Sequence, residues 1–255
     1  MKTPRLFTTL TLATLALTSA AQARSLNDIL KDGTLRVATA ADIPPFGFAS
    51  GTTVTGFEVD LITAVAADMG LKVKLVPAPI DQLSKLLNSD AVDVAMSAQA
   101  ITSTRENRVD FTTPTSCSAV SMVSTSPKLK THTDLAGKTI VVGSGSIMQS
   151  FVQKLPFDKK VSVVPTSQDV MFSMISGQAD ATFMYSAMQP AIKQMFPKAT
   201  LYFGPELWSV PQGLMIHEDA TALRLRLNAG IQRLLGNGKY ATISTKYFGK
   251  DVRCK

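Results

Sequence analysis

Strand-like and helix-like segments alternate along most of this chain, and this alternation limits the folds open to it. Three runs that read as strands, 34–40, 71–78 and 92–98, are separated by two segments with apolar residues at helical spacing. Parallel strands need crossover connections, which are usually helices. This part of the sequence therefore predicts an α/β unit with a parallel sheet.

The same pattern starts again after Pro127, with strand-like segments at 138–144, 160–166, 180–185 and 200–204 and helix-like segments between them. An extended run at 116–124 joins the two series. Two successive α/β units in a mature chain of about 230 residues predict two lobes.

The C-terminal part has no strand–helix series of its own. It contains an apolar run at 213–217 and two amphipathic helical segments at about 219–235 and 239–248. We expect these segments to pack on the first sheet, so that the chain crosses between the lobes twice and forms a hinge beside a cleft. The predicted division is lobe 1 with residues 24–115 and 212–255, and lobe 2 with residues 116–211.

The first 23 residues have the features of a secretory signal peptide. Lys2 and Arg5 precede an apolar stretch, and Ala21-Gln22-Ala23 is a small-x-small cleavage site. The apolar stretch is shorter than the roughly 20 residues that span a bilayer. We therefore expect export to the periplasm and a mature chain that starts at Arg24.

Composition disfavours several function classes. Removal of the leader lowers the formal charge from +7 to +5, and no long basic run remains, so we expect no nucleic-acid partner. The two histidines, His132 and His217, are isolated in the sequence, so we predict no metal site and no cofactor.

The two cysteines, Cys117 and Cys254, both belong to the mature chain. In an oxidising compartment such a pair is more often a disulfide than two free thiols, and the bond would tie the C-terminal tail to the middle of the chain. The alternative is two unpaired cysteines, and Cα atoms more than about 7 Å apart would exclude the bond.

Arg105 is the best candidate for a binding residue. It lies in AITSTRENRVDFTTP (100–114), just beyond a predicted strand. A guanidinium presents paired donors that match a carboxylate, and ligands of α/β folds bind beyond the carboxyl ends of strands. GSGS (143–146) adds backbone N–H groups at a helix N-terminus. The alternatives are a solvated Arg105 paired with Glu106 or Asp110, and a plain turn at 143–146.

The chain resembles the polar amino-acid family of periplasmic solute-binding proteins, the capture components of ABC importers. The resemblance covers nearly the whole mature chain and implies a class II two-lobed fold in which two crossover strands form the hinge. It implies a small-molecule ligand, typically an α-amino acid, and an inner-membrane ABC permease as partners, and we expect a monomer. The stretches that carry it are LRVATAADIPPFGF, GFEVDLITAVAADMG, VDVAMSAQAITSTRENRVDFTTP, KTIVVGSGS, GQADATF and GKYATISTKYFG.

The resemblance also implies roles for single residues. The arginine of the family's I-T-x-x-R motif binds the ligand carboxylate, and this position is Arg105. Ala98 and Ala100 stand where serines are frequent, although the backbone N–H of Ala100 remains. Ile43 replaces an aromatic residue that stacks on many ligands. Tyr185 replaces the aspartate that usually pairs with the ligand ammonium.

The missing aspartate leaves two alternatives, because burying an unpaired ammonium costs several kcal/mol. Either another acid, such as Glu206 or Asp42, approaches the ammonium, or the ligand is a carboxylate without an α-ammonium in the usual place.

The remaining expectations concern the cleft walls. We expect Phe46 and Leu83 to line the cleft, and Ser146 and Tyr185 to touch the ligand only when the lobes are shut. Arg105 would engage the carboxylate first, so that closure is favoured by contacts that only the shut form makes.

The resemblance implies a carrier and not an enzyme. The alternative is a periplasmic enzyme on the same fold, such as a cyclohexadienyl dehydratase, which needs a general acid in the cleft. Tyr185 occupies the obvious position, and its ordinary pKa near 10 suits proton donation poorly. A sensor domain needs an attached membrane span, and no stretch after the leader is apolar over about 18 residues.

Overall fold

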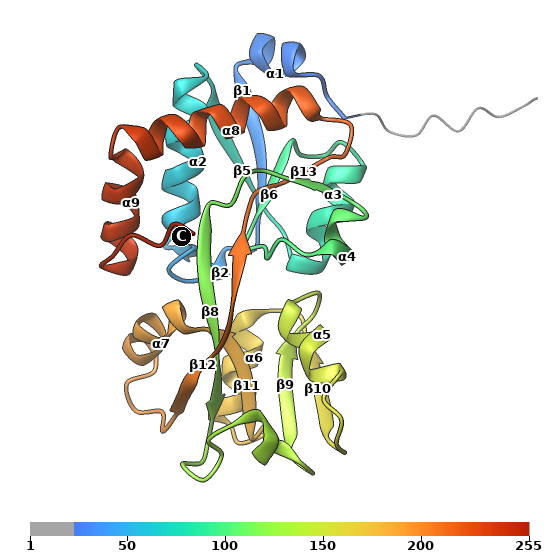
Figure 1. Cartoon of the computed structure of the whole chain (residues 1–255), viewed down its shortest axis with the longest axis vertical. Helices are drawn as coiled ribbons and strands as arrows, with labels where there is room; N and C mark the ends of the chain where they lie inside the picture. Colours follow the sequence, from blue (N-terminus) through green and yellow to red (C-terminus); the bar gives the residue numbers. More distant parts are fainter. Residues whose placement is uncertain (1–22, 255) are drawn as a thin grey trace, which may run out of the picture.

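The computed structural model describes residues 23–254. These residues form two lobes joined by two long strands, and each lobe is built on a five-stranded sheet (Figure 1). All but the last residue of the predicted signal peptide lie outside the described residues. No helix in the described part combines the length and the apolar character needed to cross a membrane.

The sheet of lobe 1 joins segments from both ends of the chain. The elements of this lobe are α1 (Leu26–Asp32), β1 (Thr34–Thr39), β2 (Asp42–Ile43), β3 (Gly47–Ser50), β4 (Thr53–Thr55), α2 (Phe57–Asp68), β5 (Lys72–Pro77), η1 (Ile80–Gln82), α3 (Leu83–Asn88), β6 (Val94–Met96), α4 (Ser103–Glu106), β7 (Asp110–Phe111), β13 (Met215–Ile216), α8 (Thr221–Gly236) and α9 (Lys239–Phe248). The strand order is β5-β1-β6-β13-β7. β5, β1 and β6 are parallel, as the sequence predicts, whereas β13 runs antiparallel to both of its neighbours.

Lobe 2 repeats this mixture of parallel and antiparallel pairing. Its elements, with the two crossing strands, are β8 (Ser116–Ser124), η2 (His132–Leu135), β9 (Thr139–Gly143), α5 (Ile147–Gln153), β10 (Lys160–Val164), α6 (Ser167–Ile175), β11 (Ala181–Tyr185), η3 (Ser186–Met188), α7 (Gln189–Met195) and β12 (Tyr202–Gln212). The strand order is β10-β9-β11-β8-β12, with β10, β9 and β11 parallel.

The second crossing strand is longer than the sequence predicts. Only residues 200–204 read as a strand, but β12 continues to Gln212. The reason is its partner, because β12 pairs with β8 in antiparallel register from Tyr202 opposite Ser124 to Gln212 opposite Ser116. The lobe limits at 115/116 and 211/212 remain predictions. They lie at the start of β8 and the end of β12, where the two crossing strands meet lobe 1 (Figure 1).

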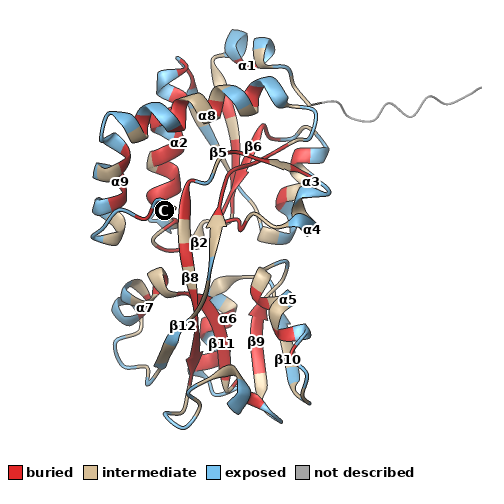
Figure 2. Cartoon of the chain, viewed as in Figure 1, coloured by how far each residue is buried: buried red, intermediate tan, exposed pale blue. Residues whose placement is uncertain are grey.

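The C-terminal helices cover lobe 1 through an aromatic cluster. Phe57, the first residue of α2, is fully buried, and its ring centroid lies 5.9 Å from that of Tyr240 and 5.1 Å from that of Phe248, both in α9. Burial of such large rings is a major contribution to stability. Figure 2 shows the buried residues concentrated in the central strands and on the inner face of α2, with the outer faces of α8 and α9 exposed.

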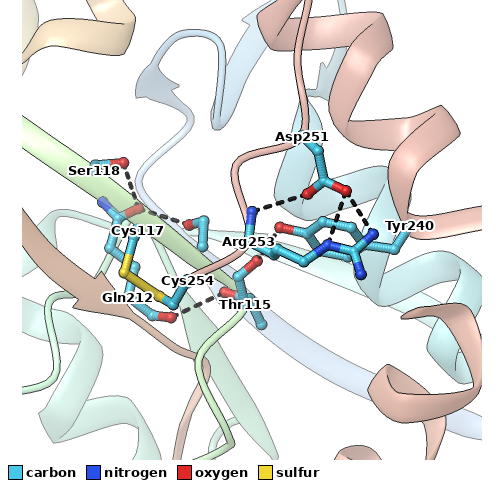
Figure 3. The surroundings of a disulfide bond; sticks show 9 residues. Thr115, Cys117, Ser118, Gln212, Tyr240, Asp251, Arg253 and Cys254 are labelled. Atoms are coloured by element: carbon cyan, nitrogen blue, oxygen red, sulfur yellow. Dashed lines mark hydrogen bonds and ion pairs between the residues drawn. A yellow bond between two sulfur atoms is a disulfide. The ribbon is translucent and has the colours of Figure 1, made fainter. Parts of the chain in front are cut away.

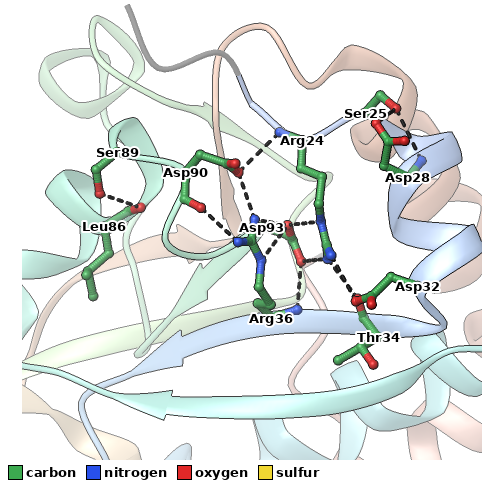
Figure 4. Close-up of polar contacts among 10 residues, drawn as sticks. All are labelled: Arg24, Ser25, Asp28, Asp32, Thr34, Arg36, Leu86, Ser89, Asp90 and Asp93. Atoms are coloured by element: carbon green, nitrogen blue, oxygen red, sulfur yellow. Dashed lines mark hydrogen bonds and ion pairs between the residues drawn. The ribbon is translucent and has the colours of Figure 1, made fainter.

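A buried ion-pair cluster braces the start of lobe 1. The side chain of Asp93 is 1% exposed and accepts hydrogen bonds from Nη2 of Arg24 at 2.6 Å and from Nη2 of Arg36 at 2.7 Å (Figure 4). Its Oδ2 also accepts from the backbone N–H of Arg36 at 2.7 Å. Asp93 therefore fastens β1 to the turn before β6, a structural role.

The predicted disulfide is confirmed. Cys117 and Cys254 are bonded, with Cα atoms 4.9 Å apart (Figure 3). Cys117 also donates its backbone N–H to the carbonyl oxygen of Val252 at 2.8 Å. The bond and this contact hold the C-terminal tail against the beginning of β8, where the first crossing leaves lobe 1.

Candidate functional site

A cavity of about 80 Å³ lies between the lobes. Lobe 1 contributes the loop after β6 and the side chains of Ile43 and Ile80, and lobe 2 contributes the starts of α5 and α6 and the end of β11. Five of the residues proposed from the sequence lie in its wall: Ile43, Ala98, Arg105, Ser146 and Tyr185.

The guanidinium of Arg105 spans the gap between the lobes. Its Nη1 donates to the carbonyl oxygen of Ala100 at 2.9 Å, and its Nη2 donates to the carbonyl oxygen of Gly145, in lobe 2, at 3.0 Å. Arg105 lies in the short helix α4, whose first turn is capped by Thr102. It does not pair with Asp110, which forms an ion pair with Nε of Arg224 at 3.1 Å.

Arg105 has no ion-pair partner among the described residues, and desolvation lowers the pKa of its guanidinium. An arginine remains charged in spite of such a shift. The site therefore holds a partly buried cation whose donors meet only carbonyl oxygens, an arrangement that favours an anion.

Gly145 brings the two lobes together beside this cation. Its φ is 72°, a conformation that L side chains rarely adopt, and a Cβ atom at this position would lie 3.3 Å from Cα of Asp81. Glycine therefore lets the strand-to-helix turn approach lobe 1 closely enough for its carbonyl oxygen to reach Arg105.

The backbone of Ala98 makes most of the polar contacts described for the lobe 1 wall. It has a positive φ of 48°, which costs roughly 1–2 kcal/mol for a residue with a Cβ atom. Its N–H points at the carboxylate of Glu58, with Oε1 at 3.0 Å and Oε2 at 2.9 Å. Its carbonyl oxygen accepts from the Tyr185 hydroxyl at 2.9 Å and from Nε2 of Gln212 at 3.2 Å. These bonds hold the strained conformation in place.

Sequence reasoning missed Glu58 and Gln212. Glu58 is fully buried in the first turn of α2, and burial raises the pKa of its carboxyl group from 4.5 to about 7. Gln212 is also fully buried, and its Oε1 accepts from the hydroxyls of Ser116 at 2.7 Å and Ser118 at 2.8 Å (Figure 3). The only sequence signal for either residue is a polar side chain inside an otherwise apolar stretch.

Three other predicted residues are placed outside the cavity wall. Phe46 is fully buried, with its ring 5.7 Å from that of Tyr185 and 5.2 Å from that of Phe248. Leu83 is fully buried in a separate apolar cluster of lobe 1. Ala100 is behind the wall, where it forms a bridge with β12 that does not use its own N–H. Phe46 and Leu83 are therefore core residues in this form.

The two acids considered as ammonium partners also lie outside the wall of the cavity. Oδ2 of Asp42 accepts from the backbone N–H of Ser167, across the lobes, at 2.7 Å. Its Oδ1 is buried and has no partner among the described residues, and burial raises the pKa of this carboxyl group. Glu206 lines a different groove, together with Pro44 and Lys250.

The lobe 2 wall is largely apolar. Tyr185 ends β11, and the cap of α5, Ser146, donates its hydroxyl to the carbonyl oxygen of Gly143 at 2.7 Å and accepts from the N–H of Gln149 at 3.1 Å. The side chains that complete the wall on this side are Ile147, Met148, Val170, Met171, Phe183, Met184 and Met188.

Known relatives share this architecture. The chain is 28% identical to a putative ABC transporter arginine-binding protein 2 of Escherichia coli K12, over 85% of this chain and 91% of the relative. It is 26% identical to a cyclohexadienyl dehydratase of Pseudomonas aeruginosa, over 81% of this chain and 86% of the relative. An ancestral arginine-binding protein solved with arginine superposes with a TM-score of 0.82 at 30% identity, over 85% of this chain and 99% of that chain.

The family model for bacterial extracellular solute-binding proteins, family 3, matches residues 35–250. This range includes both crossing strands, every residue of the cavity wall and both sheets except Thr34, the first residue of β1. The chain belongs to family 3 of the bacterial extracellular solute-binding proteins.

Proposed function

We propose that this protein captures a small carboxylate-bearing ligand, an amino acid or a related organic acid, in the periplasm and delivers it to an inner-membrane ABC permease. The observation that carries the proposal is the guanidinium of Arg105, which faces the cavity between the lobes and lacks an ion-pair partner among the described residues. A ligand carboxylate would supply the missing charge with a geometry that suits paired N–H donors.

The contacts across the cavity suggest how binding and closure are coupled. Arg105 and Ala98 in lobe 1 are hydrogen-bonded to Gly145 and Tyr185 in lobe 2. A ligand that touches both lobes favours the shut form, because the open form cannot make all of its contacts. The paired strands β8 and β12 are the connection about which such a closure would turn.

The test is a thermal-shift screen of amino acids, opines and small organic acids. A ligand present at 100 times its dissociation constant adds about 2.7 kcal/mol to the free energy of unfolding. Arg105→Ala should weaken binding of the active acid by well over tenfold, because hydrogen bonds to charged groups contribute about 1.5–3 kcal/mol.

Arg108→Ala is the matched control for this substitution. Arg108 is an exposed cation outside the cavity wall. It lines a second, outer cleft of about 580 Å³, which Asp81, Arg105 and Trp208 also line. The control should keep its affinity for the active acid. Equal binding by Arg105→Ala and the wild-type protein would contradict the proposal.

A second candidate function is a dehydratase, which the similarity to cyclohexadienyl dehydratase supports. Burial raises the pKa of Tyr185, which makes its hydroxyl an even poorer proton donor, so we favour the carrier. Incubation of the purified protein with a cyclohexadienyl carboxylic acid separates the two, because a carrier leaves the acid unchanged.

A further inference from the structure

We propose that the ligand is a carboxylic acid with an uncharged, apolar body and no ammonium group beside its carboxylate, as in a 2-oxo acid with an aliphatic side chain. This inference rests on the proposed function, because it takes Arg105 as the partner of the carboxylate. It goes further because it assigns the apolar lobe 2 wall of the cavity to the apolar body of the ligand.

The lobe 2 wall offers an apolar body a matching surface. Met148, Met171 and Met184 are each at most 7% exposed, and Phe183 is 4% exposed. All four line the cavity. Methionine side chains are flexible and polarizable, so they adapt to small apolar groups of different shape. Burial of apolar surface against this wall would contribute to binding without any further charge.

No carboxylate of the described residues is placed to pair with an ammonium in the cavity. Glu58 is fully buried behind Ala98, whose N–H it accepts. Asp81 accepts from the hydroxyl of Ser144 at 3.1 Å and lines the outer cleft. As described above, Asp42 accepts from α6, and Glu206 lines a different groove.

Tyr185 is the only ionisable side chain besides Arg105 in the described cavity wall. Its side chain lines the cavity, and its hydroxyl donates to the carbonyl oxygen of Ala98 at 2.9 Å. Burial raises the pKa of this hydroxyl, so it stays neutral. A neutral hydroxyl can accept one hydrogen bond from an ammonium, but it cannot balance the charge, and a buried charge without a partner is unfavourable.

The cavity itself has room for a short ligand, and Arg105 also lines the adjoining outer cleft of about 580 Å³. A water molecule needs roughly 10–15 Å³ of such volume, so the cavity volume of about 80 Å³ accommodates several groups of that size. The 2-oxo acid of leucine, 4-methyl-2-oxopentanoate, is therefore a suitable probe, and L-leucine is its matched control because the two differ only at the second carbon.

The decisive experiment is calorimetric titration of the full mature protein with these two probes. We expect 4-methyl-2-oxopentanoate to bind roughly tenfold or more tightly than L-leucine, because only L-leucine brings an unpaired ammonium. Equal or tighter binding of L-leucine would overturn the inference. If that binding still required Arg105, the proposed carrier function would stand. Failure of every acid in the screen would overturn both.

Two variants of Tyr185 sharpen the result. Tyr185→Asp introduces a carboxylate into the cavity wall and should shift the preference by roughly tenfold or more towards L-leucine. Tyr185→Phe removes only the hydroxyl, and its preference should stay within about threefold of the wild type. An equal shift in both variants would overturn the inference, because the hydroxyl and not the missing charge would then set the preference. If Tyr185→Asp does not fold, the wild-type pair of probes decides.

Asp42 provides the remaining test, because its Oδ1 is buried without a partner among the described residues. If the wild-type protein binds L-leucine and Asp42→Asn abolishes this binding while it keeps the oxo acid, Asp42 holds the ammonium and the inference is wrong. We expect Asp42→Asn to change the affinities for both probes by the same factor.

Discussion

The two walls of the cavity differ in chemistry. The lobe 1 wall contains a guanidinium, Arg105, and a strained backbone segment at Ala98 that four hydrogen bonds hold. The lobe 2 wall consists largely of methionine, phenylalanine and aliphatic side chains. Under the proposed function, lobe 1 recognises the charge of the ligand with fixed donors, and lobe 2 recognises the shape of its body with adaptable side chains.

The two lobes also differ in the interactions that stabilise them. Lobe 1 has the buried Asp93 cluster at its start, and the disulfide between Cys117 and Cys254 ties its C-terminal tail to the beginning of the crossing strand β8. Lobe 2 is held by its sheet and apolar core.

Removal of the disulfide should have the largest effect on this difference. The double variant Cys117→Ser/Cys254→Ser loses a bond between residues 137 positions apart. Native disulfides stabilise by about 2–5 kcal/mol, and we expect urea unfolding to show a loss in this range. Reduced wild-type protein should behave like the double variant. If the free energy of unfolding of both the double variant and the reduced protein equalled that of the oxidised wild type, the stability of lobe 1 would not depend on this bond.

Replacement of Glu58 tests the buried hydrogen bonds between its carboxyl group and the N–H of Ala98 in the lobe 1 wall. Because the pKa of this carboxyl group is raised to about 7 in the folded state, the folded protein keeps a proton that the unfolded chain releases between about pH 4.5 and 7. The free energy of unfolding should therefore fall as the pH rises, by up to about 1.4 kcal/mol per unit.

Glu58→Gln should lack this contribution to the pH dependence because an amide does not titrate, and its amide oxygen can still accept from the N–H of Ala98. The measurement is urea unfolding of both proteins at pH 5, 6 and 7. Parallel slopes would mean that Glu58 titrates like an exposed acid, and that the lobe 1 wall does not enclose it.

Titration of Asp42 should have the smallest effect of the three, because this residue acts only on the contact between the two lobes. Burial raises its pKa in the shut form, and the nearby carboxylate of Asp169 adds to this rise. Closure then takes up protons, so affinity for the active acid should increase as the pH falls towards the raised pKa of Asp42. The control, Asp42→Asn, keeps an acceptor for Ser167 and should show no such change. If Asp42→Asn kept the pH dependence of the wild-type protein, Asp42 would not be the titrating contact.

Local sequence patterns determined much of this protein. The alternation of strand and helix patterns predicted two α/β units, and the cysteine pair predicted the disulfide. The position of Arg105 beyond a strand end, together with the family resemblance, predicted a cation at a cleft. These features depend on residues close together in the chain or on simple chemical pairing, so one sequence was enough to find them.

Only the tertiary structure decided the rest. β12 reaches Gln212 because β8 pairs with it along its length. Phe46 is buried because Phe248, from the far end of the chain, packs against it. Glu58 became a support of the site because folding brings α2 behind Ala98. Each of these outcomes depends on a partner distant in sequence, and burial and strand length are set by such partners rather than by local periodicity.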